Sequence, residues 1–203
     1  MKIAALSSLI CALALSLASC SDIVNHEPLF IYGVGVDEDA KSVTLHVLAA
    51  SSEKGEKKDD GGEAGETEIT EMSVVSFSGE NAADAFGTFF ASYEDVYSGT
   101  NKVYIIGDGV SDKTLSDIAV YLVNTPHLPL KRDIAFAYSA GDLLEGCSER
   151  FTAEQFSKFF EKDGVNALLY FALTENGGTP VKPRAYLESG EKLVISDGKD
   201  GAL

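Results

Sequence analysis

The connection between two strand patterns near the start of the chain restricts the possible folds most. Residues 29–36 (LFIYGVGV) are apolar and rich in β-forming residues, and residues 42–49 (SVTLHVLA) alternate in part between apolar and polar. Only the five residues 37–41 (DEDAK), four of them charged, separate these two patterns. A parallel crossover needs about a dozen residues or more, so this connection predicts an antiparallel hairpin.

Strand and helix patterns continue after the hairpin. A third strand is predicted over 68–77, and a turn at 78–81 precedes a helix predicted over 82–96, which Gly99 ends. The buried stripe of this helix is predicted to consist of Phe86, Phe89, Phe90, Tyr93 and Val96. An aromatic stripe at helical spacing is far more often part of a core than of a ligand site.

Two further strands and two further helices indicate the fold class. A buried strand is predicted over 102–106, followed by a helix capped by Ser111 or Asp112. The next strand is predicted over 133–138, and a short helix over 140–145 ends at Gly146. This order is typical of a βαβ layer beside the first hairpin. The sequence therefore predicts an α/β (α+β) fold, with a mixed sheet, a leading antiparallel hairpin and helices packed on the sheet.

The C-terminal part predicts a further α/β region. Thr152 and Gln155 form a capping-box pattern, which predicts a helix over 153–162. Residues 167–172 fit a helix or a strand equally well. Strands are predicted over 184–187 and 192–196. We therefore expect one N-terminal domain over 29–148, and over 149–203 the start of a second domain that this chain does not complete.

The N-terminus has the pattern of an export signal. The apolar run 3–18 would rise about 24 Å as a helix, less than the ~30 Å hydrocarbon core, so a signal peptide over 1–19 is favoured over a spanning helix. The run ends in Leu17-Ala18-Ser19-Cys20, the order of a bacterial lipobox. This predicts that Cys20 carries a lipid and that 20–28 is a tether. The alternative is an ordinary cleavage site with an incidental cysteine.

Composition excludes several classes of function. The chain has 203 residues with 32 acidic and 16 basic side chains, a formal charge of -16, which argues against nucleic acid and against a basic patch that grips anionic lipid. The segment 51–67 has no large apolar residue, and we expect a mobile acidic loop there. Cys11 belongs to the signal peptide, so Cys147 remains as a single thiol, predicted to be buried and inert.

No residue pattern in the chain predicts an enzyme site. Gly33 and Gly35 resemble the start of a dinucleotide fingerprint, but the third glycine is missing, and close packing within a strand explains both better. Ser139 lies outside any nucleophile-elbow pattern. We expect no catalytic residue, no cofactor and no metal ligand. The residues weighed for these roles and assigned to turns, packing or loops are His26, His46, His127, Asp108, Asp112, Asp197 and Asp200.

The order of these blocks resembles a known family, the C-subunit lipoproteins of bacterial spore germinant receptors (the Ger(x)C family). The family pattern has a lipobox cysteine, here Cys20, and then a "giGiD" strand, a second strand, an "sGeniaeA" turn and helix, a "kviiiGe" strand and an "sAkeiL" helix. The corresponding blocks in this chain are residues 32–37, 42–50, 77–85, 102–108 and 138–144. The tail at 189–199 is similar to a hairpin of the family's second domain.

The resemblance implies a non-enzymatic role. It implies a lipoprotein on the outer face of the spore inner membrane, where it works beside two integral-membrane subunits, of the A and B type, in nutrient-triggered germination. The alternative is a generic surface lipoprotein that binds a small solute or stabilises an envelope complex. The genes beside this one distinguish the two, because a receptor subunit should lie beside genes for two multi-span proteins.

Overall fold

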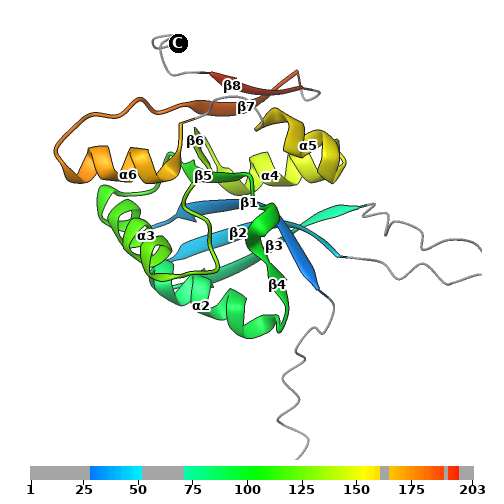
Figure 1. Cartoon of the computed structure of the whole chain (residues 1–203), viewed down its shortest axis with the longest axis horizontal. Coiled ribbons are helices and arrows are strands. Elements are labelled where there is room, and N and C mark those ends of the chain that lie inside the picture. The colour runs from blue at the N-terminus through cyan, green and yellow to red at the C-terminus, as the bar shows by residue number, and fades with distance from the viewer. Residues whose placement is uncertain (1–27, 52–70, 161–164, 190–191, 197–203) are drawn as a thin grey trace, which may run out of the picture.

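The protein is built around one mixed β-sheet (Figure 1). The computed structural model describes residues 28–51, 71–160, 165–189 and 192–196. The strands are β1 (Leu29–Glu38), β2 (Val43–Ser51), β3 (Met72–Gly79), β4 (Val96–Tyr97), β5 (Val103–Gly107), β6 (Asp133–Ala137), β7 (Arg184–Glu188) and β8 (Lys192–Ser196). The helices are α2 (Ala82–Ser92), the 3-10 turn η1 (Ser98–Thr100), α3 (Asp112–Asn124), α4 (Ala140–Ser148), α5 (Ala153–Phe159) and α6 (Ala167–Glu175).

The sheet has parallel strands at its centre and antiparallel strands at both edges. Its order is β3-β2-β1-β5-β6-β7-β8, and β4 pairs with the start of β1. Strands β1, β5, β6 and β7 run parallel to one another, whereas β2, β3 and β8 run antiparallel to their neighbours. The five-residue connection thus joins an antiparallel hairpin, β1–β2, as predicted. The fold class predicted from the sequence is confirmed.

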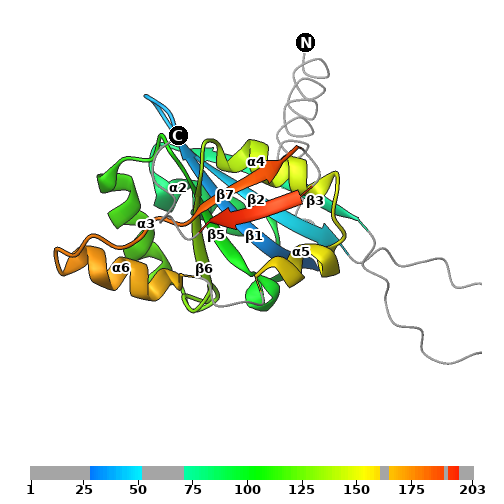
Figure 2. The ribbon, with the colours of Figure 1, turned by 90° about the horizontal axis from the view of Figure 1, so that it is seen from above.

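Helices cover both faces of the sheet, which gives three layers (Figure 2). Helices α2, α3 and α6 pack on one face, and α4 and α5 pack on the other. Strand β1 contributes to both cores because successive side chains of a strand point to opposite faces of the sheet. Ile31, Val34 and Val36 point into the first core, and Tyr32 points into the second. The pairing of β1 with β2 shifts between Ile31 and Gly33, and this bulge places Val34 and Val36 on the same face as Ile31.

Local signals predicted most helix starts correctly. Ser111 caps α3, since its side chain accepts the backbone N–H of Thr114. The capping box of Thr152 and Gln155 is present at the start of α5, which confirms that prediction. The ambiguous run at 167–172 belongs to a helix, α6, whose cap is Asn166.

Three predicted helix ends were wrong. Helix α5 ends at Phe159 and not at residue 162. Helix α2 ends at Ser92 and not near Gly99, because Val96 and Tyr97 are extended and pair with Leu29 and Phe30 of β1. Helix α4 does not end at Gly146 but continues to Ser148. A Cβ atom on Gly146 would lie 2.6 Å from Leu187 Cδ1, so this glycine allows β7 to approach the helix.

The C-terminal elements belong to the same sheet as the N-terminal ones. Strand β7 pairs with β6 through Arg184 and Phe136, and β8 extends the sheet beyond it. The boundary predicted after residue 148 therefore lies at the end of α4, between strands of one sheet. Cys20 and most of the predicted acidic loop 51–67 lie outside the described residues. Within the described ranges no helix has the length and apolar character needed to cross a bilayer.

Candidate functional site at the end of the first strand

The candidate site lies where β1 ends in two consecutive carboxylates, Asp37 and Glu38. Ligands of sheets of this type bind beyond the carboxyl ends of the parallel strands, and β1, β5 and β6 all end at this edge. Because side chains alternate along a strand, the two carboxylates point to opposite faces of the sheet. Each reaches the N-terminus of a different helix.

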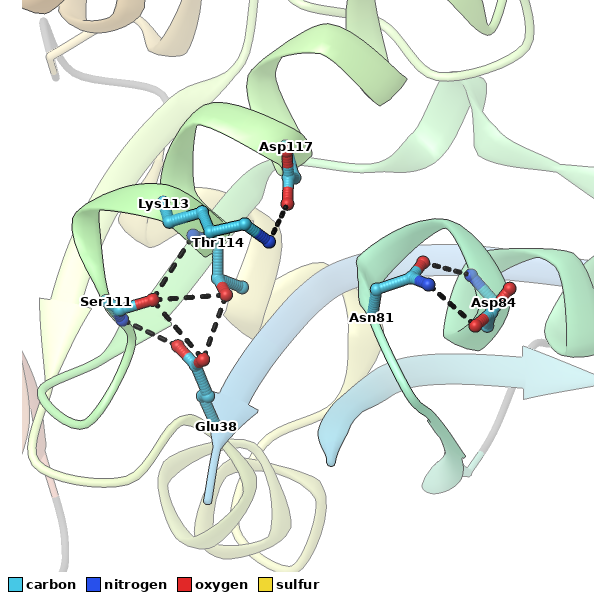
Figure 3. Close-up of polar contacts among 7 residues, drawn as sticks. All are labelled: Glu38, Asn81, Asp84, Ser111, Lys113, Thr114 and Asp117. Atoms are coloured by element: carbon cyan, nitrogen blue, oxygen red, sulfur yellow. Dashed lines mark hydrogen bonds and ion pairs between the residues drawn. The ribbon is translucent and has the colours of Figure 1, made fainter. Parts of the chain in front are cut away.

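Glu38 binds the start of α3 (Figure 3). The backbone N–H of Ser111 donates to Glu38 Oε2 at 2.6 Å. The hydroxyls of Ser111 and Thr114 donate to Glu38 Oε1 at 3.3 and 3.0 Å. Ser111 Oγ in turn accepts the N–H of Thr114, so one network joins Glu38 to the first turn of the helix. Figure 3 also shows the exposed Lys113–Asp117 ion pair on the same helix and the separate cap of α2 by Asn81.

Asp37 binds the start of α4 on the opposite face. The backbone N–H groups of Ala140 and Gly141 donate to its two carboxylate oxygens, each at 2.9 Å. The hydroxyl of Ser139, the N-cap of α4, donates to Asp37 Oδ2 at 3.3 Å and also accepts the N–H of Asp142. A negative charge at a helix N-terminus is favourable because the helix dipole is positive there.

His46 connects this cap to the edge of the sheet. Its Nε2 lies 3.3 Å from Asp37 Oδ2, and its Nδ1 lies 2.9 Å from the Oγ of Ser76, its partner across strands β2 and β3. Only 15% of the His46 side chain is exposed, against 27% for Asp37. The prediction that His46 is a packed, cross-strand residue is confirmed.

Glycines allow these groups to come together. A Cβ atom on Gly35 would lie 2.9 Å from Leu144 Cδ1 and 3.0 Å from Ala140 Cβ, and one on Gly141 would lie 2.7 Å from the His46 ring. Gly107, at the end of β5, lies directly against Asp37 Oδ1. The close packing predicted for Gly35 is therefore confirmed, and its partner is α4.

Hydrogen bonds to Asp37 and Glu38 favour their charged forms. Burial raises the pKa of Asp37, but the hydrogen bonds from His46, Ala140 and Gly141 together outweigh it, so this pKa is lowered from its usual value. Burial likewise raises the pKa of Glu38, but the hydrogen bonds from Ser111 and Thr114 outweigh this effect, so the pKa of Glu38 is also lowered from its usual value. Both side chains are thus held as carboxylates at neutral pH.

A second polar contact lies at the same edge of the sheet. The guanidinium of Arg184, at the start of β7, binds both carboxylate oxygens of Asp108, which follows β5. Tyr138, which follows β6, is 86% exposed beside this edge. Asp108 thus lies in a turn, as predicted, and its side chain also forms an ion pair with Arg184 of β7, a strand far away in the sequence.

The hydrogen bonds of Asp37 and Glu38 limit the reactions that this site could catalyse and the ligands that it could bind. Anions bind helix N-termini in many α/β proteins, but here Asp37 and Glu38 take those positions. Ser76, His46 and Asp37 follow the order hydroxyl–imidazole–carboxylate of serine hydrolases. The nearby Ala140 and Gly141 N–H groups, which could otherwise stabilise an oxyanion, are bonded to Asp37. The geometry is that of a hydrogen-bonded junction between the β1–β2 hairpin and the N-termini of α3 and α4.

Of the other candidate residues, Asp112 adjoins the site as the first residue of α3, and His127 is exposed in the loop after that helix. Cys147 is fully buried, as predicted, and burial raises the pKa of its thiol to about 12. His26, Asp197 and Asp200 lie outside the described residues. Within the described ranges no group of three or more His, Cys, Asp or Glu side chains is placed to hold a metal ion.

The roles of Asp37, Glu38 and Ser76 were not predicted from the sequence. Residues 37–41 were predicted to form a polar turn, whereas residues 37 and 38 are the last of β1. The available signal was two acidic residues directly after a buried strand, in a chain where two helices with serine caps each follow another strand. Comparison of the chain with protein-family models, with curated proteins and with solved structures gives no match.

Proposed function

We propose that the chain is a membrane-anchored lipoprotein subunit of the spore germinant-receptor type, which acts by docking to integral-membrane subunits. In this proposal Cys20 carries the lipid anchor. The protein lies on the outer face of the spore inner membrane and takes part in nutrient-triggered germination. It catalyses no reaction, and its folded domain provides the docking surface for the A-type and B-type subunits.

The observation that carries the proposal is that blocks of the family resemblance, far apart in sequence, meet at one place in the fold. Asp37 ends the first block, and it accepts the N–H groups of Ala140 and Gly141 in the last block. Gly35 of the first block packs on Leu144 of the last. Gly107, in the "kviiiGe" block, lies against Asp37. Contacts at one place in the fold therefore join blocks that are far apart in the sequence, and this supports treating the blocks as a single pattern.

The filled helix N-termini also favour docking over catalysis. The carboxyl edge of the sheet, where proteins of this architecture usually bind small ligands, has its helix N-termini bound to Glu38 and Asp37. A lipid tether would raise the effective concentration of the domain near membrane partners, so that even a weak interface could hold the complex.

The test is co-purification of the tagged full chain from spores, followed by identification of the recovered proteins by mass spectrometry. We expect the tagged chain to recover two multi-span membrane proteins whose genes lie beside its own. The matched variant Cys20→Ala should recover far less of both, because the tether is lost. If the wild-type chain recovers neither, and no multi-span genes lie beside its own, the receptor proposal is wrong. A surface lipoprotein that binds a solute or stabilises another envelope complex then takes its place.

A further inference from the structure

The edge of the sheet opposite the candidate site is formed by the first residues of several elements. We call it the amino edge, defined as residues 29–30, 94–102, 130–133 and 166–169. Backbone and side-chain bonds join these segments. They are Leu29 N–H to Asp95 O (2.9 Å), Arg132 Nη2 to Gly99 O (2.8 Å), Asp133 N–H to Lys102 O (3.2 Å), Ala167 N–H to Arg132 O (2.7 Å) and Leu168 N–H to Leu130 O (3.2 Å).

Apolar and aromatic side chains are exposed at the amino edge. Tyr97 is 53% exposed and stacks on Phe30, with ring centroids 5.1 Å apart and planes inclined by 18°. Leu168 and Leu169, at the start of α6, are 41% and 57% exposed. Tyrosine is enriched where a protein meets the headgroup region of a bilayer, since its ring is apolar and its hydroxyl is polar.

The amino edge carries a small net charge, although the chain is strongly acidic. Lys102, Lys131 and Arg132 lie there with Glu94, Asp95 and Asp133, and Glu71, directly before β3, lies at the same edge, so three basic side chains stand against four acidic ones in a chain with a formal charge of -16. An apolar surface of small net charge enters a headgroup layer with less electrostatic cost than a strongly acidic one. This contact needs no basic patch.

The position of the proposed anchor favours the same edge. Strand β1 begins at Leu29, and only the eight residues 21–28 separate it from Cys20. A chain spans at most about 3.3–3.6 Å per residue, so these residues keep the start of β1 within about 30 Å of the acylated cysteine. Phe30 and Tyr97 are at that start.

We propose that the amino edge is the membrane-facing surface of the protein, with Tyr97, Leu168 and Leu169 in contact with the headgroup region of the bilayer. The inference rests on the proposed lipid anchor at Cys20 and adds the orientation of the domain on the membrane. It places the carboxyl edge, with Asp37, Glu38 and Tyr138, away from the lipid.

The absence of tryptophan from the chain permits a direct test. The full chain, purified from producing cells with its anchor, is reconstituted into brominated phosphatidylcholine vesicles as two single-tryptophan variants. Tyr97→Trp reports on the amino edge, and Tyr138→Trp, at the opposite edge, is the matched control. We expect the emission of the first to shift to shorter wavelength and to be quenched by bromine, and the emission of the second to do neither.

A charge placed at the start of α6 refines the test. Leu169→Asp in the Tyr97→Trp chain should reduce quenching, because a carboxylate disfavours insertion into the interface. Leu173→Asp, at the other end of the same helix, should leave quenching unchanged. Circular dichroism of each variant checks that it is folded.

Flotation of the vesicles separates the two proposals. If the chain does not float with vesicles, both the anchor and the orientation are wrong. If it floats but the tryptophan at 97 is not quenched, or the one at 138 is quenched equally or more, the anchor holds and the orientation is overturned. If the two aspartate variants behave alike, α6 is not part of the contact.

Discussion

The carboxylate Oδ2 of Asp37 lies 3.3 Å from Nε2 of His46, across the β1–β2 hairpin. The same carboxylate accepts the N–H groups of Ala140 and Gly141 at the start of α4. The side chain of Asp37 thus connects the β1–β2 hairpin to helix α4, which packs on one face of the sheet. This relationship makes the stability of the fold depend on residues far apart in the sequence.

Removal of the charge at position 37 should destabilise the protein. Asp37→Asn keeps one acceptor oxygen but loses the charge that the N-terminus of α4 and His46 stabilise, and we expect a loss of about 1–3 kcal/mol in the free energy of unfolding. Urea denaturation measures it. The control is Asp117→Asn, since Asp117 makes an exposed ion pair with Lys113, and its cost should be about 0.5 kcal/mol or less. Equal losses in both variants would contradict a special role for Asp37.

The contribution of Asp37 and Glu38 should disappear at acid pH. Their pKa values are lower in the folded than in the unfolded protein, where they are about 3.9 and 4.3. The unfolded state therefore binds protons first, and the stabilisation is present above about pH 4 and lost as the pH falls through the folded pKa values.

The measurement compares wild type with the double variant Asp37→Asn/Glu38→Gln by urea denaturation from neutral pH to about pH 3. We expect the difference in unfolding free energy to narrow as the pH falls below about 4, because protonated wild type resembles the variant. A difference that stays constant over this range would show that the two carboxylates are not selectively stabilised in the folded state.

Two glycine substitutions should change the stability of the protein in opposite directions. Gly35→Ala places a Cβ atom 2.9 Å from Leu144 Cδ1, in a fully buried site, and should cost about 1–3 kcal/mol. Gly87→Ala adds a Cβ atom on the exposed side of α2 with nothing within 4 Å, and should stabilise by about 0.5–1 kcal/mol through the unfolded chain. Thermal unfolding followed by circular dichroism distinguishes them. A neutral Gly35→Ala would mean that α4 can move away from β1.

Cys20 should be the single lipidation site. Growth with a fatty-acid probe should label the wild-type chain, and Cys20→Ala should lose both the label and the membrane fraction. Cys147→Ala is the control, because the buried Cys147, whose thiol pKa is raised to about 12, should not react. Label retained in Cys20→Ala would exclude the lipobox interpretation.

The sequence predicted those parts of the fold that local patterns determine. The short connection after residue 36 predicted the hairpin, and Thr152 with Gln155 predicted the start of α5. The end of α2 was not predictable in this way, because Val96 is extended only through its pairing with Leu29. Local preferences for helix are weak, and pairing with a strand far away in the sequence overrides them.

The candidate site was less predictable for the same reason. The sequence placed His46 in a strand and identified the close packing of Gly35. It could not identify Ser76 as the partner of His46, since this pairing follows from the register of β2 and β3. Arg184 and Asp108 are 76 positions apart and meet only because β7 lies beside β6.

The bonds that β1 makes to the N-termini of α3 and α4 affect the order in which the elements fold. Glu38 is 73 positions before Ser111, and Asp37 is 103 positions before Ala140. Neither helix can complete its first turn with these partners until β1 has docked beside β5, so both should mature together with the sheet and not ahead of it. Contacts at such separations slow folding, because the loop between them must close before they stabilise anything. Release of the end of β1 would in turn remove the carboxylate partners of α3 and α4 at once, one helix on each face of the sheet, which makes this strand end a point from which loss of local order can spread to both layers.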